Sequence, residues 1–111
     1  MSEASRFIPV KSTVFLILMA LAKEPKHGYG VMLDVQERSG GTVNLGTSHL
    51  YRHLKRLLDD ALVEEVGPGP EDPDDPRRRY YQLTTLGHAV VQAESERLQR
   101  LVRDSKRLGY I

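Results

Sequence analysis

The segment Thr47–Leu62, TSHLYRHLKRLLDDAL, constrains the fold most, because its apolar residues recur with the spacing of an α-helix. The stripe consists of Leu50, Leu54, Leu57, Leu58 and Ala61. This period predicts one amphipathic helix that packs on a body along its apolar side. Either Thr47 or Ser48 is suited to cap its start.

The other face of this helix is basic. Its first half has no acidic residue, and Asp59 and Asp60 follow only in the last turn. The basic face carries His49, Arg52, His53, Lys55 and Arg56. A helix with an apolar back and a cationic, hydroxyl-rich start can place its basic side against phosphates and base edges in a major groove. The alternative is a solvated helix face, and the neighbouring segments favour the first interpretation.

The chain as a whole sets few further limits. Its 111 residues suffice for one domain, and a formal net charge of only +1 means that any nucleic-acid signal must come from charge distribution. There is no cysteine, which excludes disulfides and thiolate chemistry and fits a reducing cytoplasm, where we expect the protein. The longest apolar run, Val14–Ala22, is far shorter than the ~20 residues that a bilayer requires, so we expect no membrane partner.

Two helices are predicted before the basic one. Residues 1–9 are polar and predicted to be a flexible arm, and Val10–Ala22 is apolar nearly all round. Such a helix is buried on more than one side, by a partner chain or by the C-terminal helix. A second helix, Tyr29–Arg38, ends at Gly40–Gly41. We expect Tyr29 in the core rather than on a phosphate.

A hairpin and a long helix are predicted after it. Leu62–Val66 and Arg77–Leu83 read as two strands joined by Gly67–Pro76, which has four prolines and two glycines. Thr84 or Thr85 then caps a helix that runs to about Leu108. This helix is longer than a small domain can cover, so its second half is expected to pack on another chain.

Three helices followed by a hairpin is the order of a winged helix-turn-helix, a mainly α fold with a small β wing. We therefore predict a DNA-binding domain over residues 10–83, in which the third helix enters the major groove, and a dimerisation helix over residues 84–111. The fold alone leaves a second interpretation open, a winged-helix module that binds proteins and not DNA.

Three motifs resemble the PadR-like family of transcriptional regulators, in its subgroup with a short C-terminal helix. They are HGYG at residues 27–30, LYRHLKRLLDDALVEE at residues 50–65 and RRYYQLTTLG at residues 78–87. The resemblance implies a homodimeric DNA-binding repressor that contacts a pseudo-palindromic operator. It also implies release by a small aromatic effector, as in many members. A transcription regulator of this kind is not an enzyme, and no catalytic set is visible in the sequence.

The helix and the hairpin base supply the expected DNA contacts: Thr47, Ser48, His49, Tyr51, Arg52, Lys55, Arg56, Arg77, Arg78 and Arg79. For Tyr51 simple packing is the alternative to a phosphate contact, and Arg78 could instead pair with Glu64 or Glu65. Dimerisation is assigned to apolar residues of the first and last helices: Phe15, Leu18, Val90, Leu98, Leu101, Val102 and Leu108. An effector pocket lined by Phe15, Met19, Leu98 or Val102 is compatible with the sequence.

Three positions depart from the family pattern. Ser48-His49 stands where the family has Gly-Thr, which predicts a change in the bases read. Ala61 stands where a glycine usually follows the helix, which predicts a helix end that depends less on a left-handed residue.

The hairpin loop is acidic, with Glu71, Asp72, Asp74 and Asp75. Because carboxylates repel phosphates, we expect the arginines at the hairpin base to contact DNA in place of the tip. The tip could pair with these arginines when DNA is absent, so that neutralising the four acids should raise DNA affinity. His49 and His53 have a spacing that could hold a metal, but no further ligand matches it, so neither a metal nor another cofactor is predicted.

Overall fold

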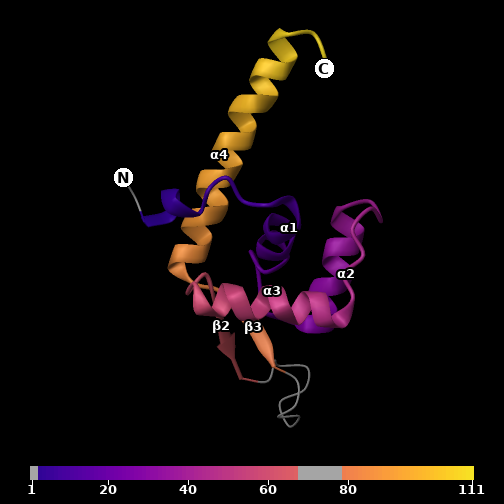
Figure 1. The fold of residues 1–111 in the computed structure, drawn as a ribbon, viewed down its shortest axis with the longest axis vertical. Coiled ribbons are helices and arrows are strands. Elements are labelled where there is room, and N and C mark those ends of the chain that lie inside the picture. The colour runs from indigo at the N-terminus through magenta and orange to yellow at the C-terminus, as the bar shows by residue number, and fades with distance from the viewer. Residues whose placement is uncertain (1–2, 68–78) are drawn as a thin grey trace.

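The computed structural model describes residues 3–67 and 79–111. Its elements follow in the order η1 (a 3-10 helix, Glu3–Phe7), α1 (Ser12–Ala20), β1 (Lys26–His27), α2 (Gly28–Arg38), α3 (Thr47–Asp59), β2 (Val63–Val66), β3 (Tyr80–Leu83) and α4 (Thr85–Arg107). The predicted mainly α, winged helix-turn-helix architecture is confirmed (Figure 1).

The core lies where α1, α2 and α3 meet the sheet and the first half of α4. Its fully buried side chains come from every one of these elements: Ile17, Leu18, Leu21, Val31, Val35, Leu50, Leu54, Val63 and Val90. From α3 the stripe residues Leu50, Leu54 and Leu57 are buried and Leu58 is partly buried, as its period predicts. The apolar stripe therefore fixes which side of α3 faces out.

Helices α2 and α3 both end in a Schellman motif, which closes a helix through a residue in the left-handed conformation. In α2 this residue is Gly40, with φ 65°, and the N–H of Gly41 donates to the carbonyl of Gln36. In α3 it is Ala61, with φ 59°, and the N–H of Leu62 donates to the carbonyl of Leu57 at 3.0 Å.

Three details of the α3 prediction are wrong. The end of α3 does need a left-handed residue. The N–H groups of Ala61 and Leu62 donate to the carbonyls of Leu58 and Leu57, and the end of α2 is closed by the same pair of backbone hydrogen bonds around a glycine. Since Ala61 lies past that end, it is exposed and not part of the stripe. The residue at the start is Gly46, without a side-chain cap, because Thr47 already has helical geometry.

The sheet has three antiparallel strands in the order β1-β3-β2. Strand β1 was not predicted, since two residues carry no alternating pattern. In it Lys26 pairs with Tyr81, and its ammonium group donates to the carbonyl of Ala20 at the end of α1. Strand β3 begins at Tyr80, three residues later than predicted, and pairs along its whole length with β2.

The N-terminal segment differs from the expected flexible arm over residues 3–9. Residues Glu3–Phe7 form η1, which packs on α4, and Ala4 is buried (Figure 1). The buried carboxylate of Glu94 on α4 holds the following residues, because it accepts a hydrogen bond from the backbone of Val10. The polar composition of residues 1–9 did not predict this contact, because its partner Glu94 lies more than eighty residues away in the sequence.

Helix α4 begins as predicted. Thr84 caps it by accepting a hydrogen bond from the N–H of Gly87 at 3.0 Å. Its first half packs on the body, and its second half extends beyond it, with Leu101 and Leu108 exposed (Figure 1). In the part of the chain that the structure describes, no helix has the length and apolarity to span a membrane.

Candidate nucleic-acid interface

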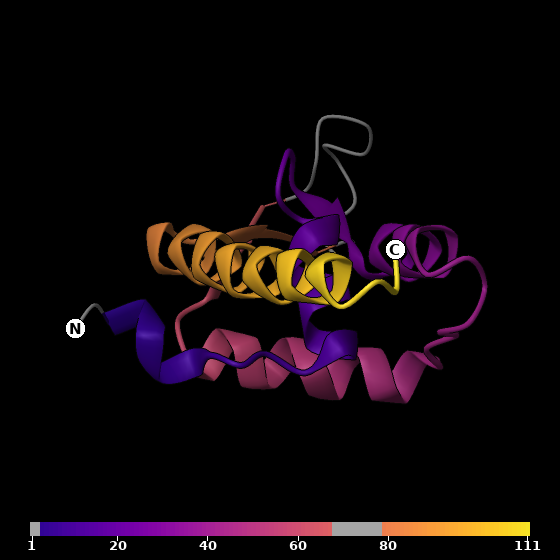
Figure 2. The ribbon, with the colours of Figure 1, turned by 90° about the horizontal axis from the view of Figure 1, so that it is seen from above.

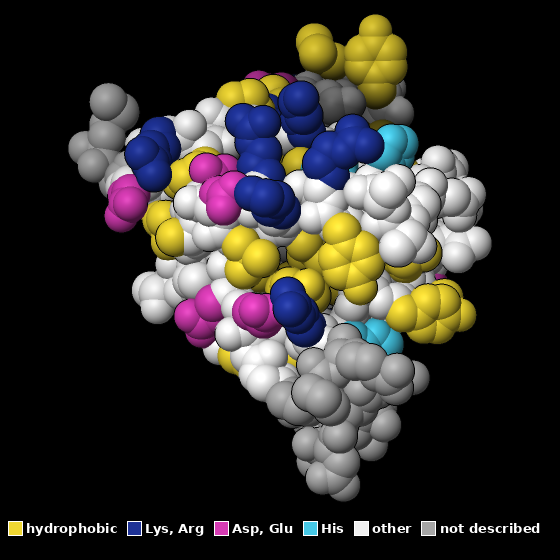
Figure 3. All heavy atoms as spheres, turned by 60° about the horizontal axis from the view of Figure 1, so that its bottom comes forward, with side chains coloured by type: hydrophobic (Ala, Val, Ile, Leu, Met, Phe, Trp, Pro, Cys, Tyr) yellow, Lys and Arg dark blue, Asp and Glu magenta, His cyan; other side chains and the backbone are white. Residues whose placement is uncertain are grey.

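The solvent face of α3 carries all seven of its predicted contact residues. The side chains of Thr47, Ser48, His49, Tyr51, Arg52, Lys55 and Arg56 are all exposed. Figure 3 shows Lys and Arg side chains gathered on the face of the molecule that α3 and the wing share. The structure thus brings the predicted residues of this helix together on one surface.

Few carboxylates of the described residues pair with the cations of this surface. Lys55 forms an ion pair with Asp59 at 3.3 Å, with both side chains mostly exposed. Among the described residues, no carboxylate pairs with Arg52 or Arg56. A surface pair contributes little to stability, so Lys55 can exchange Asp59 for a phosphate at small cost.

The electrostatic environment of His53 reports the same excess of positive charge. Its pKa is lowered from 6.5, first by burial and then by the charges of His49, Arg52 and Lys11. Three positively charged or titratable groups therefore lie near enough to His53 to act on its pKa.

The start of α3 favours anions as well. Gly46 has no side chain to cap the helix, and the first turn holds no acidic residue. The first backbone N–H groups of a helix lack partners within the helix and carry partial positive charge. In a winged helix-turn-helix, this end of the recognition helix meets base edges and phosphates.

Tyr51 is held at the edge of this surface by a glycine. Its side chain is 46% exposed, and its hydroxyl lies so close to Gly28 that a Cβ there would collide with it. The ring therefore packs on the start of α2 while much of it stays accessible. Both interpretations of Tyr51, packing and a phosphate contact, are compatible with this geometry.

Tyr29 is a surface residue that the sequence interpretation placed wrongly in the core. Its side chain is 63% exposed and stacks on His27, with ring centroids 6.5 Å apart. The buried side of α2 is formed by Gly28, Val31 and Val35. The spacing of these three residues was the signal that could have shown that Tyr29 points outward.

At the wing base, Arg79 is exposed and forms an ion pair with Glu65 at 3.4 Å. Glu64 accepts a hydrogen bond from Gln82 across the hairpin. Arg77, Arg78 and the acidic tip, Glu71, Asp72, Asp74 and Asp75, lie outside the described residues, so their predicted roles stay predictions.

The residues assigned to dimerisation separate into two groups. Leu18 and Val90 have no exposed surface and belong to the protomer's own core, so the structure corrects their assignment. Their positions at the crossing of α1 and α4 bury them within one chain. Phe15 and Leu98 are partly exposed, and Leu101, Val102 and Leu108 are more than half exposed.

Helices α1 to α3 followed by a β wing define the class of winged helix-turn-helix proteins, and here α3 presents an exposed basic face. Within that class, a model of the transcriptional regulator PadR-like family matches residues 17–93. The chain therefore belongs to the PadR-like family of DNA-binding transcriptional regulators, as its motifs predict. Members of this family are not enzymes, which confirms that expectation for this chain.

Solved structures share the fold. A PadR family transcription regulator from Clostridium difficile R20291 has a TM-score of 0.72 at 22% identity, over 88% of this chain and 98% of that one. A PadR-like transcription factor from Bacteroides fragilis has a TM-score of 0.70 at 22% identity, over 86% and 88%. A MarR family transcription regulator has a TM-score of 0.69 at 19% identity, over 93% and 61%.

A curated relative, an uncharacterized 37.1 kDa protein in transposon TN4556 of Streptomyces fradiae, is 35% identical over 89 residues. The match covers 78% of this chain but only 23% of the relative. The chain thus spans about a quarter of the length of that relative.

Proposed function

We propose that this chain binds a pseudo-palindromic operator as a homodimer and represses transcription from it. The observation that carries the proposal is the exposed face of α3, whose first half carries cations and contains no acidic residue of its own. In this arrangement α3 enters the major groove, and Arg79 at the wing base meets the phosphate backbone.

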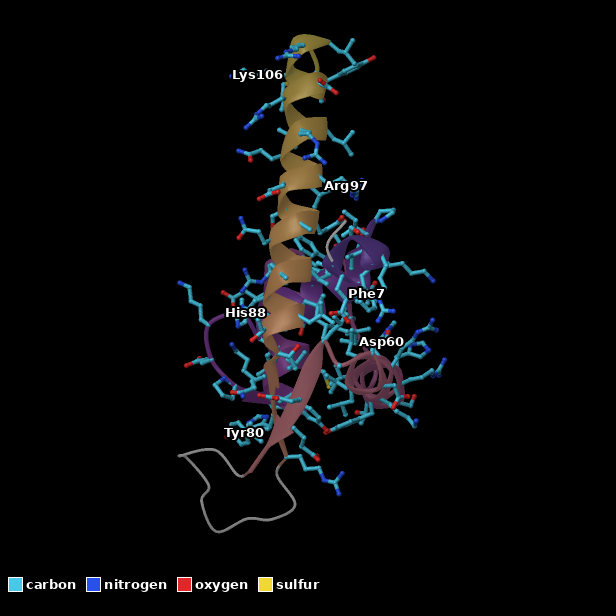
Figure 4. All side chains as sticks on the ribbon, turned by 90° about the vertical axis from the view of Figure 1, so that its left-hand side faces the viewer. Phe7, Asp60, Tyr80, His88, Arg97 and Lys106 are labelled. Carbon is cyan, nitrogen blue, oxygen red and sulfur yellow. The ribbon has the colours of Figure 1, made fainter. Side chains whose placement is uncertain are left out.

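The second half of α4 supports the homodimer. Leu101 and Val102 are 53% and 54% exposed, side by side on a stretch of helix that leaves the body. Figure 4 shows Lys106 at the end of α4 that lies farthest from the wing. A second copy packed on this stretch would cover the apolar residues and place two α3 helices about one turn of DNA apart.

Two further parts of the proposal follow from the family resemblance. A small aromatic effector releases the protein from its operator, and the site of action is the cytoplasm, with which the absence of cysteine also agrees. A winged-helix module that holds a protein partner is the second candidate, but such a module has no use for Arg52 and Arg56, which pair with no carboxylate among the described residues.

The test is binding to duplex DNA from the upstream region of the gene, measured by fluorescence anisotropy at two salt concentrations. We expect sequence-selective binding that weakens with salt. Arg52→Ala should weaken binding severalfold and flatten the salt dependence by about one unit of slope, because one phosphate contact is lost.

Lys106→Ala is the matched control, since it removes one exposed cation at the opposite end of the molecule. Its affinity and salt slope should equal those of the unaltered protein. A dimer that shows no selective DNA affinity, or a salt slope that Arg52→Ala leaves unchanged, would contradict the proposal and favour the protein-binding module.

A further inference from the structure

The second half of α4 carries a row of exposed cations that operator binding by α3 does not use. The last ten residues of this helix, 98–107, hold four cations and one carboxylate. Arg100, Arg103 and Arg107 are all exposed, and their spacing of i, i+3 and i+7 places them on one face of the helix. We call these three residues the arginine ridge.

Few carboxylates of the described residues pair with the arginine ridge. Among these residues, no carboxylate pairs with Arg100 or Arg103. Arg107 lies 3.8 Å from Asp104, and because both side chains are mostly exposed, this ion pair can exchange for another anion at small cost. Cations in the last turn of a helix interact favourably with its dipole, which explains Lys106 and Arg107 but not the two earlier arginines.

The arginine ridge stays accessible in the proposed dimer. Helical geometry puts Leu98, Leu101 and Val102 on the side of α4 roughly opposite to the ridge, so a second copy packed on these residues does not cover it. Figure 2 looks onto the C-terminal end of α4 and shows no other element in front of it. In Figure 4, nitrogen-tipped side chains project from this part of the helix, far from the wing.

The ridge also lies away from the surface that meets the operator. The longest dimension of the protein is 54 Å, and along it the far end of α4 and the wing lie at opposite ends (Figure 1). A duplex held by α3 and the wing therefore does not reach the ridge. An anion that binds the ridge belongs to a different molecule or to a distant DNA segment.

Arginines in this arrangement suit a phosphate backbone. The guanidinium group binds phosphate through two parallel hydrogen bonds and keeps its charge at neutral pH. The three arginines span about 10 Å of helix, because each residue adds about 1.5 Å. One strand of DNA carries about three phosphates over that length.

We propose that the arginine ridge binds the backbone of a second duplex, so that a dimer on its operator bridges two DNA segments. The inference rests on the proposed function in one respect, because the bridge needs operator binding by α3. Binding of DNA by the ridge itself does not need it.

The test measures energy transfer between two duplexes. The operator duplex carries a donor dye and is saturated with protein, and a scrambled duplex of equal length carries the acceptor. We expect energy transfer at low salt that disappears as the salt concentration rises, because the contacts of the ridge are electrostatic. No energy transfer with the unaltered protein at low salt would overturn the proposal.

The variant Arg100→Gln/Arg103→Gln removes two cations of the ridge and should leave operator affinity unchanged. We expect its affinity for the second duplex to fall at least tenfold and the salt dependence to flatten by about two units of slope, because two phosphate contacts are lost. Arg6→Gln/Lys23→Gln is the matched control, since it removes two exposed cations outside α4. It should bridge like the unaltered protein. Undiminished energy transfer in the ridge variant, or an equal loss in the control, would refute the assignment.

Poly-L-glutamate distinguishes DNA from an acidic protein partner. We expect it to displace the acceptor duplex only at about tenfold higher charge concentration than unlabelled duplex, because DNA carries one charge per ~1.7 Å. Equal competition would overturn the proposal in favour of an acidic protein.

Failure of operator binding is visible from the donor anisotropy before the acceptor is added. In that event the scrambled duplex is titrated alone. The ridge still predicts that Arg100→Gln/Arg103→Gln binds it more weakly than Arg6→Gln/Lys23→Gln does, and equal binding by the two variants would count against the ridge.

Discussion

Ala61 has a left-handed backbone conformation that its Cβ disfavours. It is exposed and has a φ of 59°, a value that costs an L-residue ~1–2 kcal/mol relative to the right-handed region. Glycine carries no such cost, although it loses more entropy on folding.

We therefore expect Ala61→Gly to raise the free energy of unfolding by about 0.5–1 kcal/mol, measured by urea denaturation. The control is Ala89→Gly, at an exposed position inside α4, which should lower stability by about 1 kcal/mol because the backbone there is helical. Destabilisation by both substitutions would show that Ala61 is not strained.

Glu94 is a buried carboxylate that connects two parts of the chain. It is 1% exposed and accepts hydrogen bonds from Arg97 on the same helix at 2.7 and 2.8 Å. The hydrogen bonds from Arg97 are the main cause of its lowered pKa, and the backbone of Val10 adds to the shift. The charged form is therefore the one that holds the N-terminal segment on α4.

The sign of the pH dependence follows from this lowered pKa. The stabilisation by Glu94 is fully present above its ordinary pKa of 4.5 and is lost as the pH falls through the lower value of the folded protein. We expect the stability difference between the unaltered protein and Glu94→Gln to be largest at neutral pH and to shrink below about pH 4.5.

Urea denaturation across this pH range measures the difference. Arg97→Gln keeps the carboxyl group of Glu94 but removes its main hydrogen-bond partner. This variant should therefore show a weaker dependence of the free energy of unfolding on pH. A stability difference between Glu94→Gln and the unaltered protein that is constant with pH would contradict this account.

At the level of elements, the contact between α2 and α3 sets the position of a candidate DNA contact. Gly28 at the start of α2 leaves room for the hydroxyl of Tyr51, which a Cβ would displace. The displaced atom is the far end of a side chain, so Gly28→Ala should cost only about 1 kcal/mol of stability. We expect DNA affinity to fall severalfold, because Tyr51 is moved on the recognition face.

The control for this prediction lies in the same helix. A Cβ at Gly30 meets His27 at 3.6 Å, which is an ordinary contact. Gly30→Ala should therefore leave DNA affinity unchanged, as followed by anisotropy with both variants checked for folding by circular dichroism. Equal effects of the two substitutions would show that Tyr51 is not the cause.

At the scale of the whole molecule, the apolar side chains of Leu101 and Val102 in the second half of α4 are exposed. We expect Leu101→Glu to convert the proposed dimer into monomers and to weaken operator binding by at least tenfold, because a buried unpaired carboxylate is costly and each monomer holds one α3 only. Gln99→Glu adds the same charge at an exposed position of α4 and is the control.

Analytical ultracentrifugation gives the mass, and anisotropy gives the affinity. If Leu101→Glu stays dimeric while it binds DNA normally, the second half of α4 is not the interface. In that event the partly exposed face of α1 around Phe15 becomes the next surface to test.

The sequence by itself determined the order of the four α-helices and the β2-β3 hairpin, the sides of α3 and the family. These are local properties: the period of Leu50, Leu54 and Leu57 fixes the buried side of α3, and the opposite side must then carry the cations. Thr84 could be identified as a cap in the same way, because a cap acts within a few residues of itself.

Only the tertiary structure decided the features that depend on distant partners. Strand β1 forms because two residues of β3 pair with it. The position of Ala4 depends on the packing of η1 on α4, and that of Val10 depends on Glu94. Leu18 and Val90 belong to the core and not to a dimer because α1 and α4 cross there.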